Sequence, residues 1–171
     1  MDEKKDLGTQ SAEGFIKNII EHGDITWLAS TFPNADKKKL SMEFVAFEIF
    51  LIVVSLNAFY EDKKYKGPDI GLAITKKFIK RCGELLEELK LYDNYREFME
   101  PRMIDYDKAL HNNKEPNYIY WTGKEFCLKV GQLSIGGITG ISTYMVKMMI
   151  ANKKLIEGFN QHYGYVKKQS F

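Results

Sequence analysis

An uncharged apolar segment, residues 49–60 with the sequence IFLIVVSLNAFY, constrains the fold more than any other part of the chain. Acidic residues flank this segment, and it is much shorter than the roughly 20 apolar residues with which a helix crosses a bilayer. A helix that is apolar on nearly every side is typically buried among other helices. We therefore predict a central helix that begins at Ala35 or Ser41, ends near Asp62 and is surrounded by the rest of the protein.

A second uncharged segment, residues 130–146, also raises the question of a membrane span. More than half of its residues are Gly, Ser, Thr or Gln, which insert poorly into a bilayer. The N-terminal sequence MDEKKDLGTQ is charged and lacks the apolar core of a signal peptide. These features predict a protein without a membrane span that is located in the cytoplasm.

Helical spacing of apolar residues continues through much of the remaining chain. In two long segments the apolar residues recur every three or four positions, as in helices with one buried face. The predicted inward-facing residues are Ile74, Phe78, Cys82, Leu85 and Leu89 in the first segment, and Tyr95, Phe98, Met99, Met103, Tyr106 and Leu110 in the second. Two further helices are predicted over 118–133 and 139–163.

The predicted fold is a single all-α domain, a bundle of five to seven helices around the central apolar helix. This domain is expected to span residues 11–163, after a flexible N-terminal segment over 1–10 and before a frayed tail over 164–171. Apolar residues make up 44% and charged residues 28% of the chain, a composition that excludes a disordered protein. Cys82 and Cys127 show no CxxC spacing, so we expect two free thiols.

Four glycines lie within residues 131–140, GQLSIGGITG, and three explanations compete for them. A phosphate-binding loop needs Lys and then Ser or Thr after its second glycine, but Gly137 and Ile138 occupy those positions. A short hairpin that turns at Gly136 and Gly137 fits the local alternation of polar and apolar residues. A junction between two helices, with a stop at the same two glycines and a new helix near Thr139, fits the helical context. We favour the junction, and the hairpin remains the alternative.

Glu48 stands out because it lies in the most apolar helix, between two large apolar residues. A carboxyl group buried there would have a raised pKa and could act as a general acid or base. Alternatively, Glu48 belongs to a narrow polar stripe with Ser41, Ser55 and Asp62 that faces water or a polar neighbour. The stripe is favoured because an ionised carboxylate is costly to bury without a partner.

An aromatic cluster follows a polar loop in the second half of the chain. Tyr118, Tyr120 and Trp121 can anchor a partner protein or stack on a ligand, although large rings more often pack in a core. His111 lies in the loop before them and could form a wall of the same pocket. These residues, together with Glu48, are the candidate contacts for a ligand or a protein partner.

Charge is segregated along the chain, although the formal net charge is only +2. Residues 63–81 hold seven Lys or Arg against one Asp, and residues 84–107 hold eight acids against three bases. A patch at helical spacing within the basic segment consists of Lys76, Lys77, Lys80 and Arg81. Such a patch could contact phosphates or an acidic partner. Solvated lysines are the simpler explanation, since the chain has only three Arg, the residue that most often contacts bases.

No sequence motif for catalysis is found, since a Gly-x-Ser-x-Gly pattern is absent and no histidine belongs to a recognisable metal-binding pattern. We expect no catalytic residue, no cofactor and no bound metal, and the sequence favours a non-enzymatic protein. The leading hypothesis is a regulatory or adaptor protein that acts through protein–protein contacts, including contacts with a second copy of itself. The alternatives are a helical enzyme or small-molecule-binding protein with an aromatic-lined pocket, and a nucleic-acid-binding protein that uses residues 63–81.

Overall fold

The computed structural model describes residues 7–22, 26–61, 68–90, 93–111 and 117–169. Within these ranges the protein is all-α, with seven helices and no strand. The helices are α1 (Leu7–His22), α2 (Thr26–Thr31), α3 (Lys37–Glu61), α4 (Pro68–Glu88), α5 (Tyr95–Leu110), α6 (Tyr118–Val130) and α7 (Ile135–Gln169).

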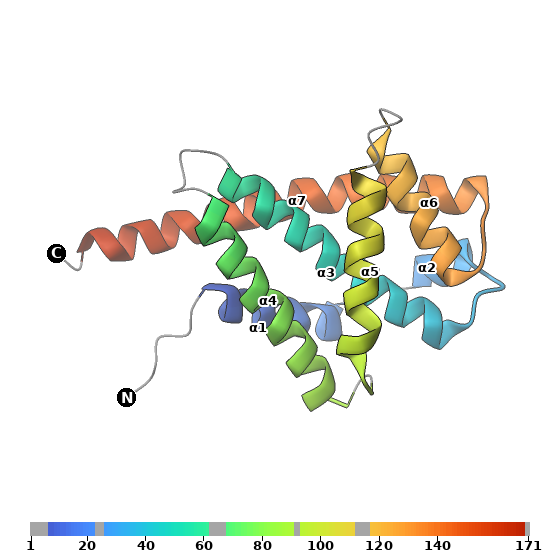
Figure 1. Ribbon diagram of the computed structural model, residues 1–171, viewed down its shortest axis with the longest axis horizontal. Coiled ribbons are helices and arrows are strands. Elements are labelled where there is room, and N and C mark those ends of the chain that lie inside the picture. The colour runs from blue at the N-terminus through green and yellow to red at the C-terminus, as the bar shows by residue number, and fades with distance from the viewer. Residues whose placement is uncertain (1–6, 23–25, 62–67, 91–92, 112–116, 170–171) are drawn as a thin grey trace.

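The central helix of the bundle is α3, the apolar helix predicted from the sequence. It packs against α4, α5, α6 and α7, whereas α1 lies along α4 and α2 lies against α7. The longest helix, α7, runs along the molecule, and its C-terminal end extends past the other helices (Figure 1). The prediction of a helical bundle around one apolar helix is confirmed.

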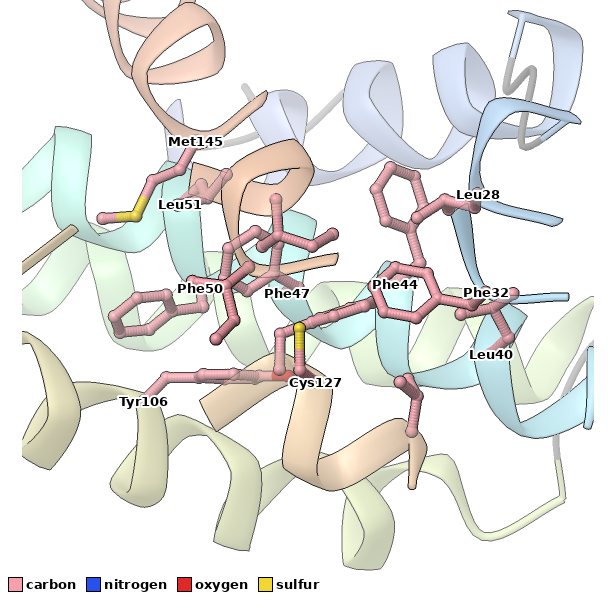
Figure 2. Packing of buried hydrophobic residues seen from close by; sticks show 14 residues of the cluster. Leu28, Phe32, Leu40, Phe44, Phe47, Phe50, Leu51, Tyr106, Cys127 and Met145 are labelled. Atoms are coloured by element: carbon pink, nitrogen blue, oxygen red, sulfur yellow. The ribbon is translucent and has the colours of Figure 1, made fainter. Parts of the chain in front are cut away.

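Aromatic rings dominate the first of two clusters of buried side chains that pack against α3. The ring of Phe47 lies 5.2 Å from the ring of Tyr106 on α5 and 5.2 Å from the ring of Phe126 on α6. Figure 2 shows Phe47 gathered with Phe44 and Phe50 of the same helix inside this cluster. These contacts between large rings hold α3 against α5 and α6.

Aliphatic and sulfur-containing side chains contribute more to the second cluster, which joins α3 to α1, α4 and α5. Its buried members include Ile16, Ile49, Phe78, Cys82, Leu86 and Met99. Because α3 supplies residues to both clusters, it needs apolar side chains on more than one face. This requirement explains why the segment carries no one-sided helical pattern.

By length and composition alone, α3 could cross a membrane, since Lys37–Phe59 contains a sufficiently long apolar window. However, 67% of that window is buried inside the bundle. No other helix in the described ranges meets the same criteria. The central position of α3 in the core accounts for its apolar composition.

The helix junction predicted within residues 131–140 is present, but the break lies at Gly131. This residue has a left-handed φ of 78°, and its N–H donates to carbonyls in the last turn of α6. Just before α7, the Ser134 hydroxyl accepts a hydrogen bond of 3.0 Å from the N–H of Gly137. The hairpin is therefore wrong, and so is a stop at Gly136 and Gly137, which lie in the first turn of α7. Glycine is favoured where a helix ends in the left-handed region, and only Gly131 fills that position here.

Other boundaries differ from the prediction in detail. Helix α1 begins at Leu7, within the segment over 1–10 that was expected to be flexible, and α7 continues to Gln169, within the tail over 164–171 that was expected to be frayed. Residues 1–6 and 170–171 lie outside the described ranges. In the last part of α4 the buried leucine is Leu86, whereas Leu89 follows the end of the helix and is 49% exposed. The inward face predicted for α5 agrees with the burial of its aromatic and methionine side chains.

Candidate functional site

Two glutamates of α3 are buried in the core, and the first of them was not predicted as a site residue. Glu43 is 0% exposed and receives a hydrogen bond of 2.6 Å from the Tyr106 hydroxyl. It also forms an ion pair with Arg102, whose Nε lies 3.1 Å from the carboxylate. Burial, with a further contribution from the Glu43 charge, raises the pKa of Tyr106, so its hydroxyl stays protonated and donates. Helix α5 thus supplies both partners of this carboxylate.

The second buried carboxyl, Glu48, lies at the contact between α3 and α7. It is 4% exposed, and the Tyr144 hydroxyl donates a hydrogen bond to its Oε1 atom. Burial raises the pKa of Glu48 to about 7, and the hydrogen bond from Tyr144 opposes this shift. The Tyr144 ring stacks on Trp27 with centroids 5.1 Å apart and lies 5.3 Å from the ring of Phe44. Glu48 therefore exchanges a proton near neutral pH beside a group of aromatic rings.

Burial of Glu48 with a raised pKa agrees with the structure, and so does a polar neighbour, since the Tyr144 hydroxyl fills that role, whereas exposure of Glu48 to water is wrong. Ser55, another member of the predicted polar stripe, is also buried, and its hydroxyl donates to a backbone carbonyl of α3. Asp62 lies outside the described ranges. The sequence did not identify this polar neighbour as Tyr144, because the two residues are 96 positions apart along the chain.

A carboxyl group with a pKa near 7 has the acidity that general acid–base catalysis requires. A catalytic carboxyl must also touch its substrate, and Glu48 is almost completely enclosed. It does not line the surface pocket that involves Trp121. The structure therefore does not bring Glu48 together with the predicted aromatic contacts.

An open pocket of about 310 Å³ lies between α5 and α6. Its lining residues are Asp105, Lys108 and Ala109 of α5, and Trp121, Lys124, Glu125 and Leu128 of α6. Trp121 is the one member of the predicted contact set that lines it. Leu128 is 50% exposed, so apolar carbon of the pocket faces water.

The Trp121 side chain is half-buried in the pocket and is held by packing. The Nζ atom of Lys124 lies 4.7 Å from its ring centroid, at cation–π distance, and the Tyr120 ring meets it edge-on at 5.4 Å. Its indole N–H is covered by protein atoms and finds no acceptor in the described part of the chain. A buried donor without an acceptor costs about 1–3 kcal/mol. This cost is consistent with a side chain retained for contact rather than for stability.

The charged residues around the pocket fall into two pairs. Asp105 and Glu125 both approach Lys129, which hydrogen-bonds Asp105 and lies 3.4 Å from Glu125. Lys108 and Lys124, one from each helix, form no ion pair with any residue that the structure describes. The pocket thus combines an indole ring with two lysines that form no ion pair within the described ranges, and one of them, Lys124, lies over that ring.

The remaining residues of the predicted contact set lie outside this pocket. His111 directly follows α5, and its Nδ1 lies 3.1 Å from a carboxylate oxygen of Asp107. Tyr118 and Tyr120 are 43% and 40% exposed at the start of α6, where Asn117 caps the helix by accepting a hydrogen bond from the N–H of Tyr120. These two tyrosines belong to the surface rather than to the core.

Sequence reasoning missed every lining residue of the pocket other than Trp121, namely Asp105, Lys108, Ala109, Lys124, Glu125 and Leu128. On α6, Trp121, Lys124 and Leu128 recur at spacings of three and four, which places them on a common helix face. This spacing could have suggested the α6 half of the site. The α5 half becomes visible only when the two helices are placed side by side.

The residues predicted to contact anions on α4 are partly neutralised by neighbouring acids. Arg81 is surrounded by three carboxylates of α1 and α4, at 2.8, 3.4 and 3.4 Å. Lys80 lies 3.8 Å from one of these carboxylates, while Lys76 and Lys77 are exposed. This arrangement weakens the case for phosphate contacts at Arg81.

Other catalytic arrangements gain no support from the described ranges. They contain no group of three His, Cys, Asp or Glu side chains placed to hold a metal ion. Cys82 and Cys127 are both buried, and burial raises the pKa of both thiols, that of Cys127 to about 11. A thiol that stays protonated at neutral pH is a poor nucleophile.

Comparison of the chain with protein-family models, with curated proteins and with solved structures finds no match. No activity, ligand or partner of a related protein can therefore be transferred to this chain. Its function has to be inferred from the contacts, burial and charges of its own residues.

Proposed function

We propose that the protein is a non-enzymatic regulatory or adaptor module that binds another protein through the α5–α6 pocket. The observation that carries this proposal is the Trp121 side chain, which lines the pocket beside the half-exposed Leu128. Tryptophan is enriched among the residues that dominate the binding energy of protein interfaces. A partner side chain that filled the pocket would remove apolar carbon from water, which favours association.

Recognition suits the chemistry of this pocket better than catalysis does. Its two carboxylates share Lys129, and its other charged groups are lysines, so no acid–base pair is poised over the pocket. The titrating carboxyl of Glu48 and the two thiols are enclosed elsewhere. We place the module in the cytoplasm, a reducing compartment in which two unpaired thiols are common.

A pair of matched leucine substitutions tests the proposal. Leu128→Arg puts a positive charge into the pocket, and the control Leu72→Arg puts the same charge on the surface of α4. The two leucines are exposed to the same extent, 50% for Leu128 and 51% for Leu72. Proteins that co-purify with the wild-type chain from its natural source are to be produced in pure form and titrated against all three proteins. We expect Leu128→Arg to raise Kd about thirtyfold, as for a change of about 2 kcal/mol at an interface hot spot. Leu72→Arg should leave Kd unchanged.

Sedimentation of the purified wild-type chain shows whether a second copy is the partner, since the same substitution at Leu128 would then dissociate the oligomer. Circular dichroism establishes that both variants remain folded. The proposal is contradicted by equal Kd values for the two variants, or by the lack of any complex between wild-type protein and the purified candidates.

A further inference from the structure

The outer face of α7 carries lysines and aliphatic side chains and lies apart from the α5–α6 pocket. The exposed residues that recur at helical spacing along it are Thr139, Thr143, Val146, Lys147, Ile150, Lys153 and Lys154. Three of these seven residues are lysines and none is an acid. The nearest acid of the same helix, Glu157, is partly buried and lies at the far end of this face.

This face is directed away from the core, because the opposite side of α7 is packed into the bundle. Ile138, Ile141 and Met145 are 7%, 0% and 0% exposed and belong to the aromatic cluster around α3. By contrast, Val146 is 39% and Ile150 56% exposed.

The three lysines are available to an anionic partner. Lys147, Lys153 and Lys154 form no ion pair within the described ranges. The net charge of +2 conceals this concentration, because acids elsewhere in the chain offset it. The positive face therefore has a local charge that the overall composition does not indicate.

The composition of this face favours a lipid surface over a protein or a nucleic acid as its anionic partner. Protein interfaces are enriched in aromatic residues and arginine and depleted in lysine, whereas these seven positions hold lysine, threonine, valine and isoleucine. Base recognition in nucleic acids also relies mainly on arginine. Lysines combined with exposed aliphatic side chains on one helix are typical of helices that lie in the headgroup region of an anionic membrane.

We infer that the outer face of α7 docks on an anionic membrane surface. Lys147, Lys153 and Lys154 contact the negatively charged headgroups, while Val146 and Ile150 enter the boundary between headgroups and acyl chains. The helix lies along the surface and does not cross the bilayer, since its other side remains packed in the core. Each lysine near such a surface strengthens binding about fivefold.

Co-sedimentation of the full chain with lipid vesicles tests this inference. Mixed phosphatidylserine and phosphatidylcholine vesicles supply the anionic surface, and pure phosphatidylcholine vesicles supply a neutral one. The test variant replaces Lys147, Lys153 and Lys154 by Gln. The matched control makes the same change at three exposed lysines in the first turn of α3, Lys37, Lys38 and Lys39, and so removes the same charge.

We expect wild-type protein to sediment with the anionic vesicles and not with the neutral ones. The α7 variant should lose about a hundredfold in partition coefficient, whereas the α3 control should lose much less. A third variant, Ile150→Ser, keeps every lysine and should bind several-fold more weakly because it loses aliphatic contact. Circular dichroism spectra that match the wild type establish that these surface changes leave the fold intact.

Three results overturn the inference. The first is that wild-type protein fails to sediment with anionic vesicles or sediments equally with neutral ones. The second is that the two lysine variants lose binding equally, or that Ile150→Ser binds as well as the wild type. The third is that duplex DNA, but not the vesicles, binds the wild-type chain and is released by the α7 substitutions, which would assign this face to nucleic acid.

Discussion

Glu43 and Glu48 lie on the same helix and are both buried, yet their surroundings differ in charge. Arg102 places a guanidinium nitrogen 3.1 Å from Glu43, and the Tyr106 hydroxyl adds a hydrogen bond. Glu48 instead receives a hydrogen bond from the neutral hydroxyl of Tyr144. The first contact is an ion pair between α3 and α5, and the second is a proton-dependent contact between α3 and α7.

The difference teaches that burial alone does not set the charge of a carboxyl group. A nearby cation favours the ionised form, whereas removal from water favours the neutral form. At Glu48 burial is the larger effect, and the pKa is raised to about 7. One helix can therefore hold a structural ion pair and a titrating group five residues apart.

Arg102→Met should have the largest effect on the free energy of unfolding, because it leaves the carboxylate of Glu43 buried without its cation. Loss of one member of a buried ion pair costs about 3–5 kcal/mol, and we expect the free energy of unfolding to fall by about 4 kcal/mol. Arg96→Met is the matched control, since Arg96 is exposed on the same helix; its effect should stay below about 0.5 kcal/mol. Urea unfolding measures the free energy of unfolding of both variants. Equal losses would show that the ion pair of Arg102 with Glu43 contributes no more to stability than an exposed arginine does.

Changing the pH should reveal the titration of Glu48. The pKa is about 7 in the folded protein against 4.5 for an ordinary glutamate, so between these values the unfolded chain releases a proton that the folded protein keeps. The stabilising contribution of the proton on Glu48 is complete below pH 4.5 and is lost as the pH rises to about 7. The loss is about 3 kcal/mol. Urea unfolding across this range should show the decline for wild type and not for Glu48→Gln, and parallel curves would refute it.

Tyr144→Phe should have the smallest effect on the free energy of unfolding, and it tests the hydrogen bond that distinguishes Glu48 from Glu43. At a pH where Glu48 is neutral, loss of one hydrogen bond lowers the free energy of unfolding by about 1 kcal/mol. Because the Tyr144 hydrogen bond lowers the pKa of Glu48, its removal should move the pH-dependent loss of stability to higher pH. Tyr106→Phe is the control, since it leaves Glu48 unchanged and should not move that loss. Urea unfolding curves at several pH values measure this shift in both variants. If the pH-dependent loss of stability does not move in Tyr144→Phe, the hydrogen bond from Tyr144 does not lower the pKa of Glu48.

The helices were largely predictable because their formation depends on local spacing. The apolar segment 49–60 identified the central helix, and the stripe that includes Tyr95, Met99 and Tyr106 identified the buried face of α5. Helix ends were less certain, since Gly131 and Gly136 look alike in sequence and only φ distinguishes the one that ends α6.

Contacts between helices could not be predicted from the same patterns. A Cβ atom at Gly123 would lie 2.6 Å from the Ser142 hydroxyl oxygen, so this glycine permits the close approach of α6 to α7. Nothing in the residues around Gly123 indicates which helix it faces. The partner of Glu48 and the α5 wall of the Trp121 pocket were hidden for the same reason, because each comes from a distant part of the chain.

Trp27 and Trp121 are the only two tryptophans in the protein, and they occupy contrasting environments. Trp27 stacks on the ring of Tyr144, whose hydroxyl donates a hydrogen bond to Glu48, whereas Trp121 lines an open pocket. Their fluorescence emission can be separated by replacing either indole with Phe. The chain therefore carries two intrinsic optical reporters, one sensitive to the protonation of its interior and the other to the arrival of a binding partner.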